Sequence, residues 1–321
     1  MAPSEPAPSS KPRIIIPGAA GLVGQNLIIR LKERGLDDIV AIDKHPDNVP
    51  LLRELHPDIE VIEADLADPG PWQQRFAGGD IVVMLQAHIG SSRPEPFVRN
   101  NITSTENVLA AIRSHGIPYL IHLSSSVVCS VADDDYTNTK RRQEELVVAS
   151  GVDACILRPT LMFGWFDRKH LGWISRFMQR VPIFPLVGRG RVLRQPMYVG
   201  DLCSIILSCI TGERYAGRIF NITGREKLCY ADIVRAIRDV QGLRTLIVPV
   251  PYTLFWLLLR IYALFDSNPP FTTDQLKALI AADEFELIPW WEIFGVPSTP
   301  FQEAIYETYR DPRFSHYVLH F

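Results

Sequence analysis

A chain of 321 residues is long enough to bury a large core, and this length fits one large domain or two closely joined ones. Hydrophobic residues make up 47% and charged residues 21%, which is typical of a soluble globular protein. A net charge of −3 gives no reason to expect nucleic acid or an anionic membrane as partner. The five cysteines show neither a C-x-x-C pair nor metal-ligand spacing, so we expect a reduced, cytoplasmic protein that binds no metal.

The first twelve residues are rich in Pro, Ser and Ala and contain no apolar run, which predicts a disordered tail and not a signal peptide. Beyond them, strand-like runs alternate with helical patterns, which predicts a parallel sheet covered on both faces. The predicted strands are 14–16, 39–43, 60–63, 81–85, 119–124 and 154–157. The predicted helices are 22–34, 50–55, 98–114 and 136–150, with a short turn near 72–76. In helix 98–114 we expect one core-facing row, made of Val98, Ile102, Leu109 and Ile112.

The first predicted strand leads into a turn with glycines three residues apart, and an amphipathic helix follows directly. Gly18 suits turn dihedrals that are closed to other residues, Gly21 lets the backbone approach a pyrophosphate, and Gly24 lets the helix lie close to the strand. The unpaired N–H groups of the first helical turn, at Leu22 and Val23, would point at the phosphates. This strand–turn–helix context predicts a dinucleotide site rather than a purely structural turn.

An acidic residue ends the second predicted strand. Asp43 lies where a carboxylate can accept both ribose hydroxyls of an adenosine, although it could also be a simple turn residue. The carboxylate would repel a 2′-phosphate, which favours NAD, while Lys44 beside it leaves some room for NADP. Asp65 and Leu66, after the third strand, lie where the adenine amino group could be bound.

A second group of polar residues begins with Ser124, Ser125 and Ser126 at the end of the fifth strand and continues with Tyr136 and Lys140. Residues at i and i+4 share one helical face, and an ammonium near a phenol lowers the pKa of the tyrosine. Such a tyrosine can exchange a proton with a substrate hydroxyl during hydride transfer, while a serine holds the same oxygen. The alternative is that the Y-x-x-x-K pair lies on a solvated helix face.

The last third of the chain is less regular. Residues 229–241 predict a helix. The segment from Tyr252 to Phe265 is strongly apolar, contains Arg260 and is too short to span a bilayer comfortably. It is either a helix packed over a substrate cleft or an interfacial helix that meets lipid or a lipid-like substrate.

The chain resembles the extended short-chain dehydrogenase/reductase family, in its NAD-dependent epimerase/dehydratase branch, over most of residues 13–310. The motifs that carry the resemblance are GAAGLVG, Asp43, SSS, YTNTK, LRPTLMFG, RQPMYVGDL and FNITG, in that order. The resemblance implies that Tyr136 is the acid/base, Lys140 binds the nicotinamide ribose, and Ser125 orients the substrate. It also implies cofactor contacts from Ser124, Gln86, Ala87, Pro159 and Thr160.

The same resemblance implies a Rossmann-type doubly wound parallel sheet with a smaller carboxyl-terminal α/β region. We expect an NAD-binding domain over 13–160, to which 195–225 returns, and a substrate-binding region over 161–194 and 226–321. The resemblance further implies a homodimer paired through the helices 98–114 and 136–150.

The substrate side resembles nucleotide-sugar epimerases only in part. Arg194 falls where those enzymes place an arginine on the substrate diphosphate, although it could be a surface arginine, and we assign Ser126 to the substrate as well. Leu161 stands where an asparagine often meets the substrate phosphate. Val127 and Val128 replace the acid pair that a dehydratase commonly carries, which counts against dehydration.

We therefore expect NAD-dependent oxidation, lasting or transient, of a secondary alcohol on a sugar derivative carried by a nucleotide or lipid. The enzyme would be an epimerase or a dehydrogenase/reductase. The alternative is a non-catalytic NAD(P)-binding accessory or membrane-peripheral subunit, because the end of the chain resembles accessory subunits of respiratory complex I. The apolar segment 252–265 would supply the membrane contact, whereas the intact Ser125, Tyr136 and Lys140 favour the enzyme.

Overall fold

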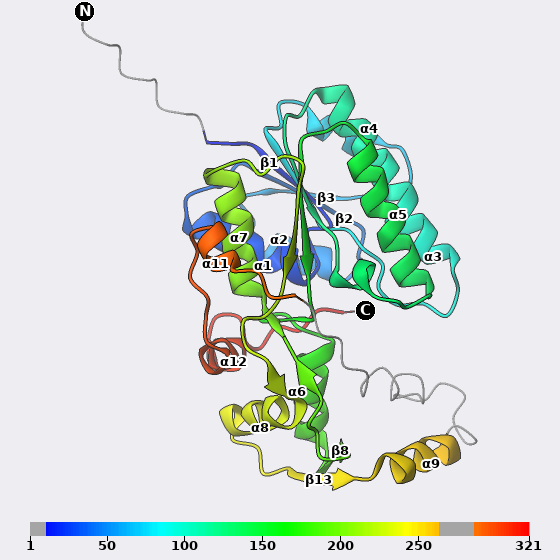
Figure 1. Cartoon of the computed structure of the whole chain (residues 1–321). Helices are drawn as coiled ribbons and strands as arrows, with labels where there is room; N and C mark the ends of the chain where they lie inside the picture. The colour runs from blue at the N-terminus through cyan, green and yellow to red at the C-terminus, as the bar shows by residue number, and fades with distance from the viewer. Residues whose placement is uncertain (1–10, 263–285, 321) are drawn as a thin grey trace, which may run out of the picture.

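A seven-stranded parallel sheet forms the centre of the protein (Figure 1). The computed structural model describes residues 11–262 and 286–320, so most of the predicted tail and residues 263–265 of the apolar segment lie outside it. The strand order is β11-β6-β5-β4-β1-β2-β3. Successive strands are added on one side of β1 as far as β3 and on its other side from β4 onward. Dinucleotides bind at this kind of switch point, and the order confirms the predicted Rossmann-type fold.

The strands alternate their side chains between two apolar layers. Ile14 and Ile16 face one layer and Ile15 the other, and all three are completely buried. Helices α1 and α7 cover the first layer, and α4 and α5 cover the second. The strands are β1 (Ile14–Pro17), β2 (Ile39–Asp43), β3 (Glu60–Glu63), β4 (Ile81–Met84), β5 (Leu120–Leu123), β6 (Ala154–Pro159) and β11 (Arg218–Ile222). The helices are α1 (Leu22–Glu33), α2 (Asn48–Leu55), α4 (Ser104–His115), α5 (Asp135–Ala149) and α7 (Val199–Thr211), with the 3-10 turn η1 (Pro71–Phe76).

The helix predicted over 98–114 is longer and less regular than expected. It consists of α3 (Glu95–Phe97), the π-helical turn η2 (Val98–Thr103) and α4. Leu109 and Ile112 are buried as predicted, but Val98 is 46% exposed, so its predicted core position is wrong. A π-helical turn contains more residues than an α-helical turn, so it rotates the residues before it out of the α-helical row.

The rest of the described chain forms small two-stranded sheets and helices beyond the end of the main sheet (Figure 1). The strand pairs are β7 (Met162–Phe163) with β10 (Met197–Tyr198), β9 (Leu193–Arg194) with β12 (Leu228–Cys229), and β8 (Ile183–Val187) with β13 (Leu246–Val250). The helices there are α6 (His170–Arg180), α8 (Tyr230–Gln241), α9 (Tyr252–Tyr262) and α12 (Phe301–Arg310). Helix α11 (Trp290–Ile293) instead lies beside α7 (Figure 1). Within the described ranges, no helix combines the length and apolarity needed to cross a membrane.

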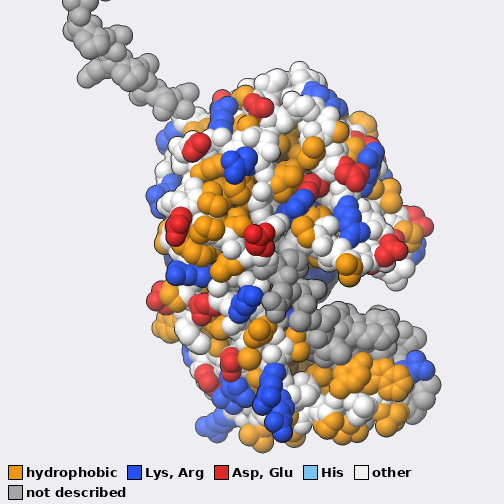
Figure 2. Space-filling view, viewed as in Figure 1, with side chains coloured by type: hydrophobic (Ala, Val, Ile, Leu, Met, Phe, Trp, Pro, Cys, Tyr) orange, Lys and Arg blue, Asp and Glu red, His pale blue; other side chains and the backbone are white. Residues whose placement is uncertain are grey.

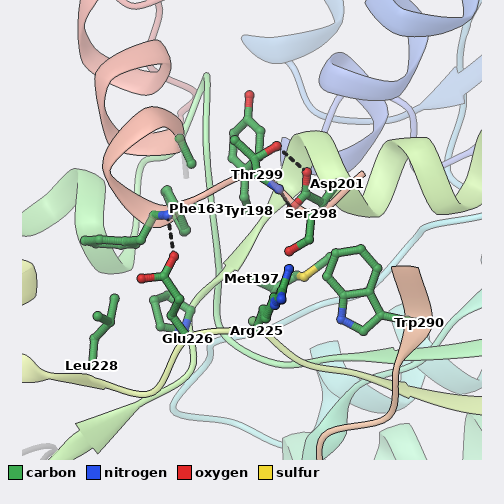
Figure 3. A pocket seen from close by; sticks show the side chains of 14 residues that line it. Phe163, Met197, Tyr198, Asp201, Arg225, Glu226, Leu228, Trp290, Ser298 and Thr299 are labelled. Carbon is green, nitrogen blue, oxygen red and sulfur yellow. Dashed lines mark hydrogen bonds between the residues drawn. The ribbon is translucent and has the colours of Figure 1, made fainter. Parts of the chain in front are cut away.

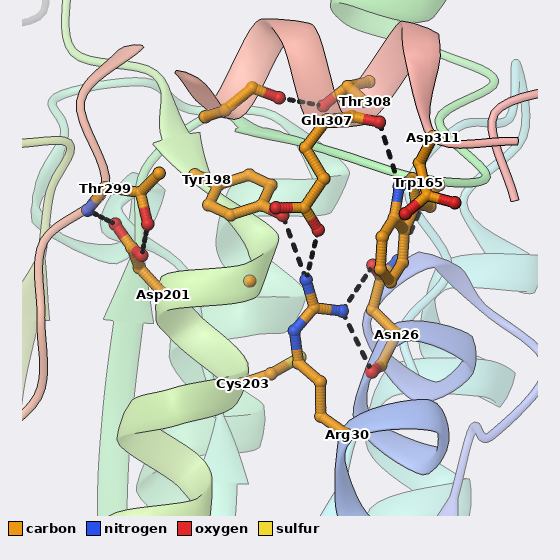
Figure 4. A network of polar contacts seen from close by, with 12 residues as sticks. Asn26, Arg30, Trp165, Tyr198, Asp201, Cys203, Thr299, Glu307, Thr308 and Asp311 are labelled. Carbon is orange, nitrogen blue, oxygen red and sulfur yellow. Dashed lines mark hydrogen bonds and ion pairs between the residues drawn. The ribbon is translucent and has the colours of Figure 1, made fainter. Parts of the chain in front are cut away.

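A cluster of polar contacts around Arg30 connects the small two-stranded sheets and their helices to helix α1 of the main sheet (Figure 4). The guanidinium of Arg30, on α1, donates to Tyr198 Oη at 3.0 Å and pairs with Glu307 of α12 at 3.2 Å. It also lies 4.5 Å from the ring centroid of Trp165, a cation–π distance. One side chain thus connects α1, β10, α12 and the loop after β7.

Candidate active site

The glycine turn joins β1, α1 and the end of β4. Gly18 has a φ of +83°, and a Cβ there would lie 2.4 Å from the backbone nitrogen of Gln86. A Cβ on Gly24 would lie 2.2 Å from the carbonyl oxygen of Ala19. The fold itself therefore requires glycine at both positions.

Gly21 is different, because its own chain leaves it room. It precedes α1 with an extended backbone, and a Cβ there would meet only the carbonyl oxygen of Gly18, at 3.6 Å. In the part of the chain described, no side chain caps the helix start, so the amides of Leu22 and Val23 have no capping partner. Both polar atoms of the Gln86 amide are buried without a hydrogen-bond partner among the described residues. A free helix start, room above Gly21 and an unpaired amide fit a bound dinucleotide.

The acidic residue at the end of β2 is held beside this turn. Asp43 Oδ2 accepts from the amide of Ala20 at 2.9 Å, and Oδ1 accepts from the amides of Lys44 and His45. Lys44 Nζ instead pairs with Asp65 Oδ2 at 3.0 Å. Burial acts to raise the pKa of Asp65, but hydrogen bonds from Ala67, Lys44 and Arg99 outweigh it and lower that pKa. Lys44 therefore pairs with Asp65 and not with Asp43, whose carboxylate lies beside the glycine turn.

Ser125 and Tyr136 come together at the carboxyl end of β5. Ser125 precedes the 3-10 turn η3 (Ser126–Cys129), and Tyr136 lies in the first turn of α5. Burial raises the pKa of Tyr136, a hydrogen bond with Ser125 acts to lower it, and the charge of Asp134 raises it further. Asp134 also caps α5 by accepting from the amide of Thr137 at 2.9 Å, a role that the sequence did not reveal.

Lys140 lies one turn after Tyr136 but points into the protein. It is 1% exposed, and its Nζ donates to the carbonyl oxygen of Leu123 at 3.0 Å and to Gln143 Oε1. Burial lowers the pKa of Lys140 to about 7, against a smaller opposite effect of Glu144. The predicted lowering of the Tyr136 pKa by Lys140 is therefore wrong in this structure, since burial dominates both groups and the ammonium turns to Leu123 and Gln143.

Polar residues that the sequence did not single out hold the side chains of Lys140 and Ser124 in place. Gln143 Nε2 donates to Thr105 Oγ1 at 2.8 Å, which orients the amide that receives Lys140. Ser124 Oγ donates to Glu144 Oε2 at 2.6 Å, and Arg158 pairs with the same carboxylate. Ser124 thus has a buried structural partner in addition to its predicted contact with the cofactor.

The remaining predicted residues are spread around the ends of the strands. Ala87 is exposed after β4, Leu66 is buried after β3, and Ser126 is buried at the start of η3. Pro159 ends β6, and the adjacent Thr160 donates its hydroxyl to the carbonyl oxygen of Gln195 at 2.8 Å. Arg194 is half-buried on β9, where its charge acts on Tyr230.

A small internal cavity lies elsewhere, between β10, the start of α7 and Trp290 (Figure 3). Its volume of about 20 Å³ holds about one water molecule. Asp201 borders it and accepts two hydrogen bonds from Thr299. Burial raises the pKa of Asp201 to about 6, despite these bonds. Neither Ser125 nor Tyr136 lines this cavity, so we take it as a packing feature.

Residues 14–223 match the sequence profile of the NAD dependent epimerase/dehydratase family, which covers more than half of the chain. The chain belongs to this family. The match confirms the predicted family and, with it, NAD as the cofactor.

This chain has sequence relatives with different names. It is 28% identical to a 3 beta-hydroxysteroid dehydrogenase/Delta 5→4-isomerase of Mycobacterium tuberculosis, over 72% of this chain and 70% of the relative. It is 27% identical to a dTDP-glucose 4,6-dehydratase of Streptomyces griseus, over 71% and 78%. It is 22% identical to the mitochondrial NADH dehydrogenase (ubiquinone) 1 alpha subcomplex subunit 9 of Mus musculus, over 92% and 79%.

Solved structures in the family share the fold. The dTDP-glucose 4,6-dehydratase DesIV of Streptomyces venezuelae, a double mutant with NAD and DAU bound, superposes with a TM-score of 0.72 at 18% identity. That alignment covers 94% of this chain and 98% of DesIV. The UDP-glucuronic acid 4-epimerase of Bacillus cereus in complex with NAD superposes with a TM-score of 0.65 at 22% identity, over 84% and 99%.

The buried Lys140 makes stability depend on pH. Its pKa is about 7 in the folded protein and about 10.4 in an unfolded chain, so between these values the unfolded chain binds more protons. Stability contributed by this group therefore rises as the pH increases from about 7 to about 10.4. We expect the free energy of unfolding of wild type, relative to K140M, to increase by a few kcal/mol over this range in urea titrations. The exposed Lys11 provides the control K11M, and a flat difference for K140M would show that Lys140 stays charged.

Proposed function

We propose that this protein is an NAD-dependent oxidoreductase or epimerase that acts on a secondary alcohol of a sugar carried by a nucleotide or a lipid. The placement of the Ser125 hydroxyl beside that of Tyr136, close enough to act on the pKa of the phenol, is the observation that carries the proposal. The two hydroxyl groups lie at the carboxyl end of β5, the edge of the sheet where the glycine turn also lies. The dTDP-glucose and UDP-glucuronic acid relatives support the substrate class.

Different residues of the chain would bind the cofactor, orient the substrate and accept its proton. The amides of Leu22 and Val23 and the open backbone at Gly21 would hold the pyrophosphate of NAD, and Asp43 would accept the ribose hydroxyls. When bound, NAD supplies a hydride acceptor for the carbon that carries the substrate alcohol. Ser125 orients the alcohol oxygen, and Tyr136 Oη takes its proton as the carbon–oxygen double bond forms.

Lys140, Gln143 and Thr105 form a rigid support under this pair. Lys140 is fixed by the carbonyl oxygen of Leu123 and by Gln143, so its ammonium stays at the end of β5. We assign it to the nicotinamide ribose, as the family resemblance implies. For Tyr136 to act as a base its pKa must fall, and the hydrogen bond with Ser125 acts in that direction.

We also propose that two copies pair through α4 and α5. Val148, an apolar residue on α5, is 63% exposed, and Val98, at the start of the turn η2 that leads into α4, is 46% exposed. Exposed apolar side chains on α5 and on η2 suit a shared contact between two copies.

One observation favours a non-catalytic accessory subunit as the second candidate. The mitochondrial complex I subunit of Mus musculus aligns over 92% of this chain, more than the steroid or sugar-nucleotide relatives do and about as much as a 2-alkyl-3-oxoalkanoate reductase of Stenotrophomonas maltophilia, which covers 91%. A subunit of that kind would bind the cofactor without needing the Ser125–Tyr136 pair.

The experiment is to purify the protein, identify bound NAD(H) and its redox state, and incubate it with UDP- and dTDP-hexoses. Epimerisation predicts tightly held NAD and interconverted sugars, whereas a dehydrogenase predicts exchangeable cofactor and oxidised sugar. Wild type and Y136F should differ in turnover but not in cofactor content. Bound cofactor with equal, negligible turnover in both proteins would contradict the enzyme proposal and favour the accessory subunit.

A further inference from the structure

The end of the molecule that carries α9 exposes many apolar side chains. On α9, Leu254, Trp256, Leu257 and Ile261 are between 37% and 49% exposed. Figure 2 shows hydrophobic side chains gathered over this helix, at the lower right of the view. Such clustering is unusual for a surface that faces only water.

The strand pair that leads into α9 extends the apolar surface. Leu246 pairs with Ile183 across β13 and β8, and these two residues are 64% and 51% exposed. The alternate residues Phe184 and Leu186 are buried on the opposite face of the pair. Since α9 begins two residues after β13, the strand pair and the helix lie at the same end of the protein (Figure 1).

Arginines surround this apolar end. Residues 179–194 and 230–262 contain eight arginines and two aspartates, although the whole chain has a net charge of −3. Both aspartates are already paired, Asp232 with Arg235 at 2.8 Å and Asp239 with Arg238 at 2.7 Å. The whole-chain charge thus conceals a strongly basic end.

Four of these arginines line one open pocket of about 560 Å³, between α8 and the strand pair. They are Arg189, Arg191, Arg235 and Arg238, and the apolar Ile247 of β13 lines the same pocket. Arg189 and Arg191 are exposed, and no described residue forms an ion pair with either of them. Ile247 pairs with the buried Phe184, so the pocket opens on the face of the strand pair opposite to Leu246 and Ile183. Guanidinium groups suit the phosphates of lipid head groups.

We propose that this end docks on the surface of an anionic phospholipid bilayer, with α9 lying in the interface and the pocket arginines on lipid phosphates. At 1.5 Å per residue, the described part of α9 is about 16 Å long, roughly half the hydrocarbon thickness, which suits a segment lying along the membrane surface. Apolar residues with a tryptophan and flanking cations are the composition that interfacial helices use. The proposal uses neither NAD nor Tyr136, so it stands or fails independently of the proposed function.

The test is flotation of the full chain with phosphatidylcholine vesicles that contain or lack phosphatidylglycerol. We expect wild type to float with the anionic vesicles, and added salt to weaken binding. L254E/L257E should abolish flotation, and R189Q/R191Q should reduce the bound fraction with anionic vesicles about tenfold. Retained NAD binding in each variant shows that it is folded.

Matched controls carry the same substitutions on other surfaces. V131E/I219E changes two exposed apolar residues, and R53Q/R142Q changes two exposed arginines away from α9. Both should float like wild type. If wild type stays with the unbound fraction, or if the controls lose binding as strongly as the test variants, the proposal is wrong. If wild type does not float and L254E/L257E instead lowers its oligomeric mass, the surface is an interface between copies.

Discussion

Replacing Tyr136 with phenylalanine is expected to lower turnover by about 10²- to 10⁴-fold while the protein still binds NAD. The substitution removes only the phenolic oxygen, which in the structure meets Ser125 at the end of β5. The helix is unaffected, because Asp134 caps α5 through Thr137 and not through Tyr136. The loss should therefore appear in kcat with little change in the melting temperature. Steady-state kinetics on the sugar nucleotide found by screening, together with NAD titration, provide the measurement.

Two variants separate proton transfer from general damage. S125A should lower kcat less than Y136F does, because it removes the orienting hydroxyl and leaves the proton acceptor. Y306F removes the phenolic oxygen of a tyrosine that is 64% exposed on α12, and it should leave kcat unchanged. Activity of Y136F within a few-fold of wild type would exclude Tyr136 as the acid/base and leave its hydroxyl without a chemical role in this protein.

The first half of the fold could be predicted because buried parallel strands are continuous apolar runs between helical patterns. The predicted ranges of β2 and β3 match the structure, and β1 and β4 differ by one residue at one end. The small strands β7 and β10 could not be found, since two residues in extended conformation become a strand only through their tertiary partner.

The site was predicted as a set of residues but not as a set of interactions. Spacing places Tyr136 and Lys140 on one helical face, yet it cannot show that Lys140 turns to the carbonyl of Leu123. The pairing of Glu144 with Arg158 joins α5 to β6 and depends on how the helix packs on the sheet. Burial then decides the pKa of Tyr136, and burial is a property of the folded protein.

The glycine turn offers the second large effect, because Gly24 and Gly21 differ in what a methyl group would meet. We expect G24A to lower the free energy of unfolding by about 3 kcal/mol, since the new Cβ would lie 2.2 Å from the carbonyl oxygen of Ala19. The loop cannot easily move away, because the amides of Gly18 and Ala19 both donate to the carbonyl oxygen of Ile42. Urea unfolding followed by circular dichroism measures the loss.

G21A is the matched variant on the same turn. Its Cβ would be 3.6 Å from the nearest heavy atom, so stability should stay within about 0.5 kcal/mol of wild type. NAD affinity should nevertheless fall about tenfold or more, because the methyl group would occupy the space through which the pyrophosphate approaches the helix start. G35A, at a φ of +71° with no neighbour within 4 Å, controls for backbone strain alone and should cost about 1 kcal/mol without changing NAD affinity. If G21A binds NAD as tightly as wild type, the pyrophosphate does not pass over Gly21, and the cofactor site must be placed elsewhere along the strand ends.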